Sequence, residues 1–566
     1  MSRTLFWYIF KDLLKVFLLT GGVLTGIMSF GGLLKPLTKY GLDASQVGQM
    51  LAYFTPAMLT YSLPVSALFA TTFVFGRLAA DNEITACRAA GISFPMLTFP
   101  AVIMGLLISL VSVLLLCFVV PAAILRAERV IYANLGSLVT HSIERSNKIS
   151  FDAGVAPVTI FAGTAFQPAV TEPPPPGKDR QVVAMQNVSI ITYDRTNPDL
   201  PVPGEIYTAR EAVVWLTRPL EDDYSNVEMS VQLTDGSMFP RTVTGTRGDA
   251  LIVDIGATQF GPYEVESPLR ENTKFLDIRR LQEVKQDPTE SARVSRHASR
   301  LVRERQREAF IAGLLERVQN EGQIVLEAAG GTIWRLDLLG ADAEQYGSRL
   351  FARLPDDAPP MLVMQDKPGQ APTIIEARQL SLAAAADPEF GRIYLNLSLV
   401  DTVVRDGGGE PYARRNPVYT LSVDMPADVL ELEGMSLEAL YGHPGIAPGD
   451  KRTLRRNEYK TLNSVIGEIH SRASFSVSCL VLTVVGSMLG MMFRSGNFLS
   501  AFAVSSVPAL LTVMLIVTGQ HACEDVYVLP NGDVKNVVPQ GLALIWGGNA
   551  VVAMAGAAML WRLARR

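Results

Sequence analysis

The sequence "RLAADNEITACRAAGIS" (residues 77–93) is a short polar segment between two long stretches that carry no charged residue. Its charged residues fall within its first twelve positions and are Arg77, Asp81, Glu83 and Arg88. Asp81 or Asn82 can cap the start of a helix, and Gly91 can end one in a left-handed turn. The segment therefore predicts a two-turn helix, about residues 81–91, at a membrane surface.

The stretches on either side belong to a set of charge-free segments long enough to cross a membrane. An apolar helix of about 20 residues spans the hydrocarbon core of a bilayer. The first segment lacks a clear small-residue cleavage site and runs on toward the second, so we interpret it as a helix rather than a signal peptide. Six transmembrane helices are predicted, in residues 16–34, 44–76, 89–125, 473–493, 495–520 and 536–561. Five prolines are expected to mark kinks or ends in the second and third helices: Pro56, Pro64, Pro95, Pro100 and Pro121.

The composition of the whole chain agrees with a mixture of membrane and soluble parts. Of its 566 residues, 48% are hydrophobic and 19% charged, and the mean hydropathy is +0.23. The net charge of -5 gives no reason to expect nucleic acid as a partner. None of the four cysteines lies in the long polar middle of the chain, so that region must be stabilised by its own core rather than by disulfides.

The basic residues near the helix ends predict the orientation. If the six helices alternate in direction, nine basic residues share one side: Arg3, Lys11, Lys15, Arg77, Arg88, Arg494, Arg562, Arg565 and Arg566. The positive-inside rule makes that side cytoplasmic. Lys35 and Lys39 fall on the opposite side and are the exceptions. The chain is therefore expected to be a multi-pass protein of the bacterial inner membrane, with both termini cytoplasmic and a large domain in the periplasm.

We divide the chain into transmembrane helices 1–3 (residues 1–125), a periplasmic domain (126–470) and transmembrane helices 4–6 (471–566). Several stretches of the periplasmic domain alternate apolar and polar residues, as half-buried strands do: "NVEMSVQL" from Asn226, "RIYLNLSL" from Arg392 and "VYTLSVDM" from Val418. Asp235-Gly236 is a turn signal after the first of these strands. The fold class is thus membrane α plus β, with an inserted antiparallel domain.

Two further features of the middle region leave alternatives open. "IYTAREAVVWL" from Ile206 and "IIEARQLSL" from Ile374 resemble each other, which would fit a duplicated β-unit. Between them, the segment from Ser291 has the spacing of a helix with several arginines, which either bind phosphate groups or form a solvated, salt-bridged face. "TEPPPPGKDR" from Thr171 predicts a stiff exposed loop.

Motifs for catalysis or metal binding are absent from the sequence. There is no nucleotide-binding G-x-x-x-x-G-K-[ST], no H-E-x-x-H, no G-x-S-x-G, and no Cys/His cluster at metal spacing. We therefore expect neither a catalytic site nor a metal site, and no cofactor bound by this chain.

"RLAADNEITACRAAGIS" resembles the coupling helix of the LptF/LptG (YjgP/YjgQ) permeases, the membrane subunits of the lipopolysaccharide export ABC transporter. The residues that match are Glu83 followed by Arg88, Ala89, Ala90 and Gly91. "MQNVSIITYD", "IYTAREA", "LTDGSMF" and "GEIHSRASFS" support the resemblance, the last through its membrane-proximal residues Glu468, His470 and Arg472. Members of this family are usually much shorter, so a segment of about residues 237–430 is extra.

The resemblance implies a fold of three plus three helices around a periplasmic β-jellyroll. It also implies a partner ABC ATPase dimer, which uses ATP and Mg and is contacted by the coupling helix through Asp81, Glu83, Arg88 and Gly91. Two permeases pair, lipopolysaccharide leaves the bilayer through a gate lined by the first and fifth helices, and periplasmic bridge proteins receive it. Lys35 and Lys39 match basic residues that contact lipopolysaccharide phosphates, or they only anchor the helix at the interface.

A competing hypothesis is a membrane-anchored periplasmic scaffold or receptor without transport activity. It requires no ATPase partner and gives Glu83 no role. The sequence leaves open whether the second permease is a copy of this chain or a different one, whether this chain is F-like or G-like, which glycolipid is carried, and what the extra segment does.

Overall fold

The computed structural model describes most of the chain. The described residues are 3–40, 44–133, 135–152, 157–168, 178–194, 202–219, 227–239, 253–265, 273–328, 331–355, 358–369, 371–387, 392–406, 411–414, 417–492, 498–529, 534–535 and 537–564. They form two compact units, each assembled from separate parts of the chain. The membrane unit contains residues 1–133, 268–294 and 452–566, and the β unit contains residues 134–267 and 295–451.

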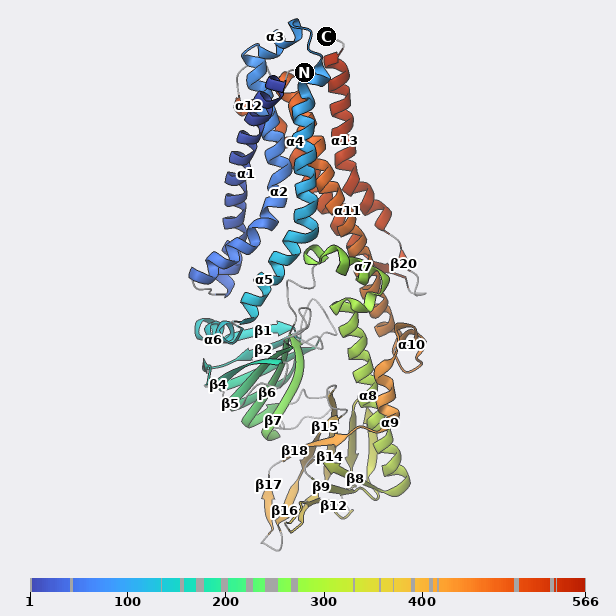
Figure 1. Ribbon diagram of the computed structural model, residues 1–566. Coiled ribbons are helices and arrows are strands. Elements are labelled where there is room, and N and C mark those ends of the chain that lie inside the picture. Colours follow the sequence, from blue (N-terminus) through green and yellow to red (C-terminus); the bar gives the residue numbers. More distant parts are fainter. Residues whose placement is uncertain are drawn as a thin grey trace. The chain divides into compact units, whose positions relative to one another are not determined.

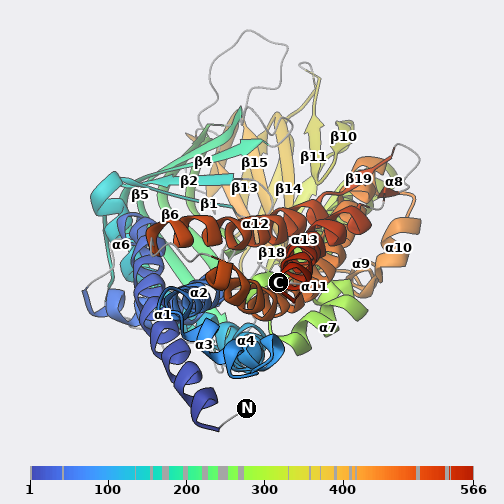
Figure 2. The same ribbon diagram turned by 90° about the horizontal axis from the view of Figure 1, so that it is seen from above.

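The membrane unit is a bundle of long helices, shown from the side in Figure 1 and from above in Figure 2. Among the described residues, six helical spans of this unit are long and apolar enough to cross a membrane, which confirms the expected three plus three. The long helices are α1 (Arg3–Tyr40), α2 (Ala44–Ala80), α4 (Phe94–Leu114), α5 (Val120–Ala133), α11 (Pro448–Met492), α12 (Phe498–Glu524) and α13 (Val538–Ala564).

Most of these helices are longer than the charge-free stretches that predicted them. The fourth is the clearest case, because α11 has 45 residues and begins at Pro448, whereas the charge-free part begins at residue 473. A helix needs to be apolar only where it crosses hydrocarbon, and it can continue into water with charged side chains. The charge pattern therefore located the membrane crossing but not the ends of the helices.

The third span is interrupted by a π-helical turn, Leu115–Val119, which joins α4 to α5. Pro121 follows directly. Its ring removes one backbone donor and crowds the carbonyl four residues earlier, at Cys117, so the regular hydrogen-bond pattern cannot continue there. Pro56, Pro64 and Pro100, in contrast, lie inside the continuous helices α2 and α4.

Small residues allow the helices of the bundle to approach closely. A Cβ added to Gly490 of α11 would lie 2.6 Å from the carbonyl oxygen of Thr72 in α2, and one added to Gly541 of α13 would lie 2.8 Å from the backbone nitrogen of Cys523 in α12. Without a hydrophobic driving force between helices in lipid, such close packing is a main source of helix association.

Interhelical hydrogen bonds add to this packing. Ser109 of α4 donates to the carbonyl of Ser476 in α11 over 2.7 Å, and Asn549 of α13 donates to the carbonyl of Ser474 over 2.8 Å. Large apolar side chains such as Leu19 of α1 and Met514 of α12 are exposed on the outside of the bundle, where lipid is expected.

The first sheet of the β unit is antiparallel and follows α6 (Leu135–Ser146). Its strands lie in the order β1-β2-β4-β5-β6-β7, and β3 pairs with β4. The bounds are β1 (Lys148–Asp152), β2 (Pro157–Phe161), β3 (Thr164–Phe166), β4 (Lys178–Asp194), β5 (Val202–Pro219), β6 (Val227–Phe239) and β7 (Val253–Val265). Val227, Met229, Val231 and Leu233 of β6 are buried, as their alternation predicts. The segment "TEPPPPG" lies outside the described residues.

The prediction of a turn at Asp235-Gly236 is wrong, because β6 continues through both residues to Phe239. Asp235 takes a left-handed backbone (φ 53°), and the pairing of β6 with β7 shifts register at this point. A residue pair that favours positive φ also suits a β-bulge, which bends a strand without ending it. The sheet therefore extends past residue 237, the expected start of the extra segment.

The second sheet of the β unit has eleven strands and a large apolar core. Its order is β10-β11-β14-β15-β18-β8-β9-β12-β13-β16-β17, with antiparallel pairs throughout the described residues. The bounds are β8 (Gln323–Ala328), β9 (Thr332–Asp337), β10 (Asp342–Tyr346), β11 (Arg349–Arg353), β12 (Met361–Asp366), β13 (Thr373–Ala377), β14 (Gln379–Asp387), β15 (Arg392–Val400), β16 (Thr402–Asp406), β17 (Tyr412–Arg414) and β18 (Val418–Asp424).

Helix α8 (Ala292–Glu321) precedes this sheet and contributes Phe310, Ile311, Leu314 and Val318 to the same core. The helices that follow are α9 (Ala427–Leu430) and α10 (Leu437–Gly442). The two similar stretches do not form the same structure: residues 206–216 are part of one strand, β5, whereas residues 374–382 form parts of two strands, β13 and β14. A short local likeness carries no information on where a strand ends, because strand ends depend on pairing with distant strands.

Candidate functional site: the coupling segment and the buried network of the membrane unit

The polar segment of residues 77–93 contains a short helix, α3 (Glu83–Ala89), between α2 and α4. Gly91 has a positive φ of 80°, as a residue that ends a helix in a left-handed turn does. The expected side-chain cap is absent: Asn82 occupies the cap position in a left-handed conformation (φ 60°), and no side chain caps the first turn. An N-cap side chain reaches the free amides from an extended backbone, which a left-handed residue does not have.

Helix α3 has one face against the bundle and one face open. Ile84 and Cys87 pack against an apolar cluster built from residues of α1, α2, α4 and α11. Asp81, Arg88 and Gly91 are exposed, and Glu83 is half-buried. The helix is therefore anchored to the apolar core of the bundle and still presents a polar surface.

Two polar contacts tie α1 to this segment. The hydroxyl of Tyr8 donates to Oε1 of Glu83 over 3.4 Å, and Arg77 at the end of α2 forms an ion pair with Asp12. Both contacts are partly open to solvent, so each one adds little to stability. They do link the first helix to the segment between α2 and α4.

Lys35 and Lys39 lie on the last turns of α1, which runs to Tyr40. Their side chains are outside the described residues, so the phosphate-binding role stays a prediction.

Glu468 and Arg472 form a buried ion pair one turn apart on α11, with 2.7 Å between Oε1 of Glu468 and Nε of Arg472. The side chains are 6% and 3% exposed. Removing one partner of a buried pair typically costs about 3–5 kcal/mol, because the remaining charge stays uncompensated in a medium of low polarity. Arg472 therefore does not extend to the lipid headgroups, and it pairs with Glu468 instead.

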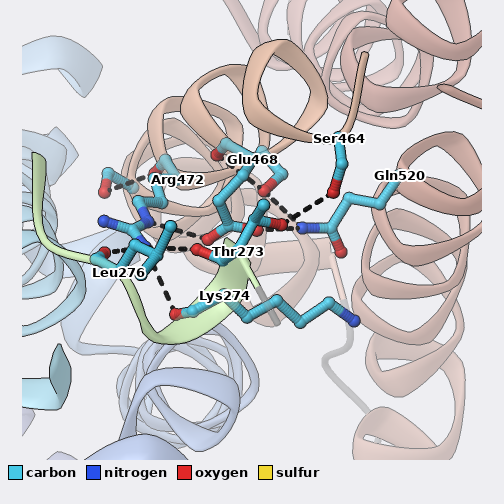
Figure 3. Close-up of polar contacts among 9 residues, drawn as sticks. Thr273, Lys274, Leu276, Ser464, Glu468, Arg472 and Gln520 are labelled. Atoms are coloured by element: carbon cyan, nitrogen blue, oxygen red, sulfur yellow. Dashed lines mark hydrogen bonds and ion pairs between the residues drawn. The ribbon is translucent and has the colours of Figure 1, made fainter. Parts of the chain in front are cut away.

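The second oxygen of Glu468 is held from another helix. Nε2 of Gln520 in α12 donates to Oε2 of Glu468 over 2.8 Å and to Oγ of Ser471 over 2.6 Å (Figure 3). Both carboxylate oxygens are thus hydrogen-bonded, which offsets much of the cost of burying the charge.

Arg472 also binds the backbone of residues Thr273–Leu276, which we call the return segment because it follows the first sheet and re-enters the membrane unit. Nη2 of Arg472 lies 3.3, 3.2 and 2.7 Å from the carbonyl oxygens of Thr273, Lys274 and Leu276 (Figure 3). Three of these residues form the 3-10 turn η2 (Thr273–Phe275), and an arginine near the end of a helical turn can satisfy its free carbonyls.

The return segment is followed by α7 (Ile278–Gln286), whose first turn is capped by Asp277, and by the 3-10 turn η3 (Pro288–Glu290). The apolar face of α7 packs on α11, where Leu281 and Val284 contact Val465. The short strands β19 (Tyr527–Val528) and β20 (Val534–Lys535) pair between α12 and α13.

His470 does not join the network of Glu468 and Arg472. Nε1 of Trp546 in α13 lies 3.3 Å from Nδ1 of His470, on a more exposed side of α11. Residues two positions apart on a helix point about 200° apart, so the three residues expected as one membrane-proximal group divide between two faces.

Sequence reasoning missed Gln520 and the return segment. Gln520 ends the charge-free stretch of residues 495–520. A polar side chain is costly in a membrane unless it has a partner, and its position there could therefore have indicated a buried contact. The sequence "TKFL" (residues 273–276) contains no local signal that its carbonyls accept hydrogen bonds from Arg472, which lies 196 residues after Leu276. Among the described residues, no three His, Cys, Asp or Glu side chains gather as a metal site would.

A comparison with protein families matches residues 7–274 to the model of the lipopolysaccharide export system permease LptF/LptG. No curated protein sequence matches the chain. The matched part includes α1, α2, the coupling segment, α4 and the first sheet through the start of the return segment. Permeases of this family are transmembrane subunits, and ATP hydrolysis lies in a separate subunit of their transporter. Residues 7–274 of this chain therefore belong to the LptF/LptG family, whose members are inner-membrane permease components of the lipopolysaccharide export ABC transporter.

Proposed function

We propose that α3 is the surface through which an ABC ATPase subunit drives this permease. One observation carries the proposal: Ile84 and Cys87 of α3 pack against the apolar core of the bundle, while the opposite side of α3 is open. A helix held this way transmits a push to the membrane helices that share this core. Its exposed Arg88 and half-buried Glu83 supply charges for a polar groove on the partner.

The test is recovery of the ATPase with the detergent-solubilised permease. Glu83→Ala and Arg88→Glu are expected to reduce the recovered ATPase at least several-fold, while the permease stays in the membrane. Arg562→Glu is the matched control, because Arg562 is an exposed arginine in the last turn of α13. Equal recovery of the ATPase with wild type and with both α3 variants would contradict the proposal and support a scaffold.

The orientation follows the same proposal, since an ATPase that uses cytoplasmic ATP requires α3 and both termini on the cytoplasmic side. The β unit then lies in the periplasm. Cysteine at position 346, where the native Tyr346 on β10 is 63% exposed, should react with a membrane-impermeant maleimide in intact spheroplasts. Cysteine in place of the exposed Thr85 of α3 should react only after lysis. The reverse pattern would overturn this orientation.

The remaining partners follow from the family. We infer that this chain pairs with a second permease, either a copy of itself or a different member, and passes lipopolysaccharide to periplasmic bridge proteins. The chain binds no cofactor of its own, and ATP and Mg belong to the ATPase. Lipid leaves the bilayer beside the first and fifth membrane helices, α1 and α12, both of which expose large apolar side chains such as Leu19 and Met514.

Lys35 and Lys39 at the far end of α1 are proposed to attract the phosphates of the lipid headgroup. Lys35→Glu combined with Lys39→Glu should abolish most of the stimulation of ATP hydrolysis by lipopolysaccharide without changing the recovery of the ATPase. An unchanged stimulation would leave both lysines as interface anchors.

A further inference from the structure

The return segment is attached to three helices of the membrane unit. Phe275 packs against Ala57 of α2 and against Val120 and Ile124 of α5. Oγ1 of Thr273 lies 2.8 Å from Oγ of Ser464 in α11. These contacts position the segment, but neither of them responds to a movement of α12.

Arg472 supplies the attachment that does reach α12. Its Nη2 binds three carbonyls of the return segment, and its Nε binds Oε1 of Glu468. A guanidinium is planar and fixed, so holding one edge against Glu468 fixes where the other nitrogens point. Glu468 therefore orients Arg472 toward the return segment.

Gln520 in turn orients Glu468. Its amide donates a hydrogen bond to Oε2 of Glu468 over 2.8 Å, while Arg472 on α11 donates to Oε1. One carboxylate oxygen is therefore bound from α11 and the other from α12. The result is a continuous buried chain of contacts from α12, through Glu468 and Arg472, to the return segment (Figure 3).

The position of α12 against α11 decides whether this chain is closed. The two helices touch at Gly467, the residue before Glu468: a Cβ added to Gly467 would lie 3.1 Å from Cβ of Cys523 in α12. Cys523 is three residues after Gln520, on the same side of α12. A small outward movement of α12 is enough to take the amide of Gln520 beyond hydrogen-bond distance of Glu468.

We propose that Gln520 and Arg472 are positioning residues that couple the movement of α12 to the attachment of the return segment. The inference rests on the proposed function, in which lipid passes beside α1 and α12. When α12 moves away from α11, Gln520 releases Glu468, Arg472 loses its orientation, and the carbonyls of the return segment lose their donor. The movement of α12 that accompanies the passage of lipid thereby weakens the attachment of the return segment, which follows the first sheet.

The experiment is hydrogen exchange on the complete transporter in nanodiscs, read on peptides that cover residues 273–286, with and without ATP and vanadate. In wild type, trapping should raise exchange in these residues several-fold. Gln520→Met keeps the length of the side chain but removes the hydrogen-bond donor. In this variant, exchange in residues 273–286 should already be raised without nucleotide, and ATP with vanadate should not raise it further. Gln540→Met is the matched control, because the same change falls on an exposed residue of α13.

Two more variants keep the test decisive if Gln520→Met fails to assemble. Arg472→Lys retains the charge beside Glu468 but not the donor geometry, and Gly467→Ala displaces α12 without removing a polar group, so both should raise exchange in residues 273–286. A purely structural role for the network would lower the thermal midpoint and leave the nucleotide response as in wild type.

A wild-type response in these variants would overturn the inference. So would an unresponsive return segment in a wild-type transporter that hydrolyses ATP and moves lipid, an outcome that leaves the proposed function intact. Failure of the proposed function is seen separately, as the absence of an ATPase in the purified complex, and it would overturn the inference as well.

Discussion

At the scale of single residues, the charged groups of this chain fall into two kinds. Arg77, Asp12 and Glu83 interact in partly solvated places at one end of the bundle. Glu468 and Arg472 are buried and depend on each other. Loss of a partner therefore has small consequences in the first group and large ones in the second, because only buried charges lack water to replace the missing partner.

The buried pair leads to a stability prediction. Arg472→Met should destabilise the membrane unit by about 3–5 kcal/mol, because Glu468 is left without its cation. The double variant Glu468→Gln with Arg472→Met should recover much of that loss, because no uncompensated charge remains. The midpoint of thermal unfolding in detergent measures both. A double variant at least as unstable as Arg472→Met would contradict the argument.

His297 of α8 predicts a pH dependence. Burial, and after it the charge of Arg300, lower the pKa of His297 to about 4, although contact with Asp450 opposes the shift. In the unfolded chain the pKa is about 6.5. Between these values the unfolded state binds the proton and the folded state does not, so stability falls as the pH drops from about 6.5 to about 4.

His297→Gln should remove this contribution to the pH dependence. The quantity to measure is the difference in thermal midpoint between wild type and the variant from pH 7 to pH 4. Wild type should lose stability relative to the variant as the pH falls, and a constant difference would contradict the prediction.

At the scale of elements, helix packing in the membrane unit depends on where glycine is obligatory. Gly541 and Gly547 lie on the same helix, α13, but only Gly541 faces α12 closely. A Cβ on Gly541 would lie 2.3 Å from Sγ of Cys523 and 2.8 Å from its backbone nitrogen, whereas one on Gly547 meets nothing within 4 Å. The same substitution should therefore destabilise the protein at Gly541 but not at Gly547.

Gly541→Ala is expected to lower the thermal midpoint of the solubilised protein, because the backbones of α12 and α13 must separate. Gly547→Ala should leave the midpoint unchanged or raise it slightly, since alanine is the better helix former. Equal effects of the two substitutions would show that close approach of the backbones is not what holds α12 and α13 together.

At the scale of the whole molecule, the two units have separate cores. The apolar core of the second sheet is built from residues 310–429, and the main cluster of the membrane bundle from residues 9–108, Cys479 and Met491. No residue belongs to both clusters. Damage to one core should therefore leave the packing of the other unchanged.

Leu397→Ala tests this separation, because Leu397 is fully buried in the second sheet. The substitution should cost about 2–5 kcal/mol locally through the cavity that it leaves. Limited proteolysis should become faster within residues 323–424, while recovery of the ATPase partner stays as in wild type. A loss of ATPase recovery would show that the second sheet supports the membrane unit.

The membrane architecture, the alternating strands and the likeness to the family can be predicted from the order of the amino acids alone. Charged side chains are so costly in hydrocarbon that the six membrane spans are visible in the sequence as charge-free stretches. The alternation of apolar and polar residues in β6 and β15 follows from the two faces of a sheet, one buried and one exposed. The segment from Arg77 to Ser93 was equally readable, because its signals are local in the chain.

Which polar residues contact one another, in contrast, depends on how the chain folds. Gln520 lies 52 residues from Glu468, and Leu276 lies 196 residues from Arg472. The same holds for the bulge at Asp235, which local signals present as a turn, and for the separation of His470 from Glu468 and Arg472. Burial and hydrogen-bond partners are set by elements that are distant in sequence, so a residue's own neighbours in the chain cannot specify them.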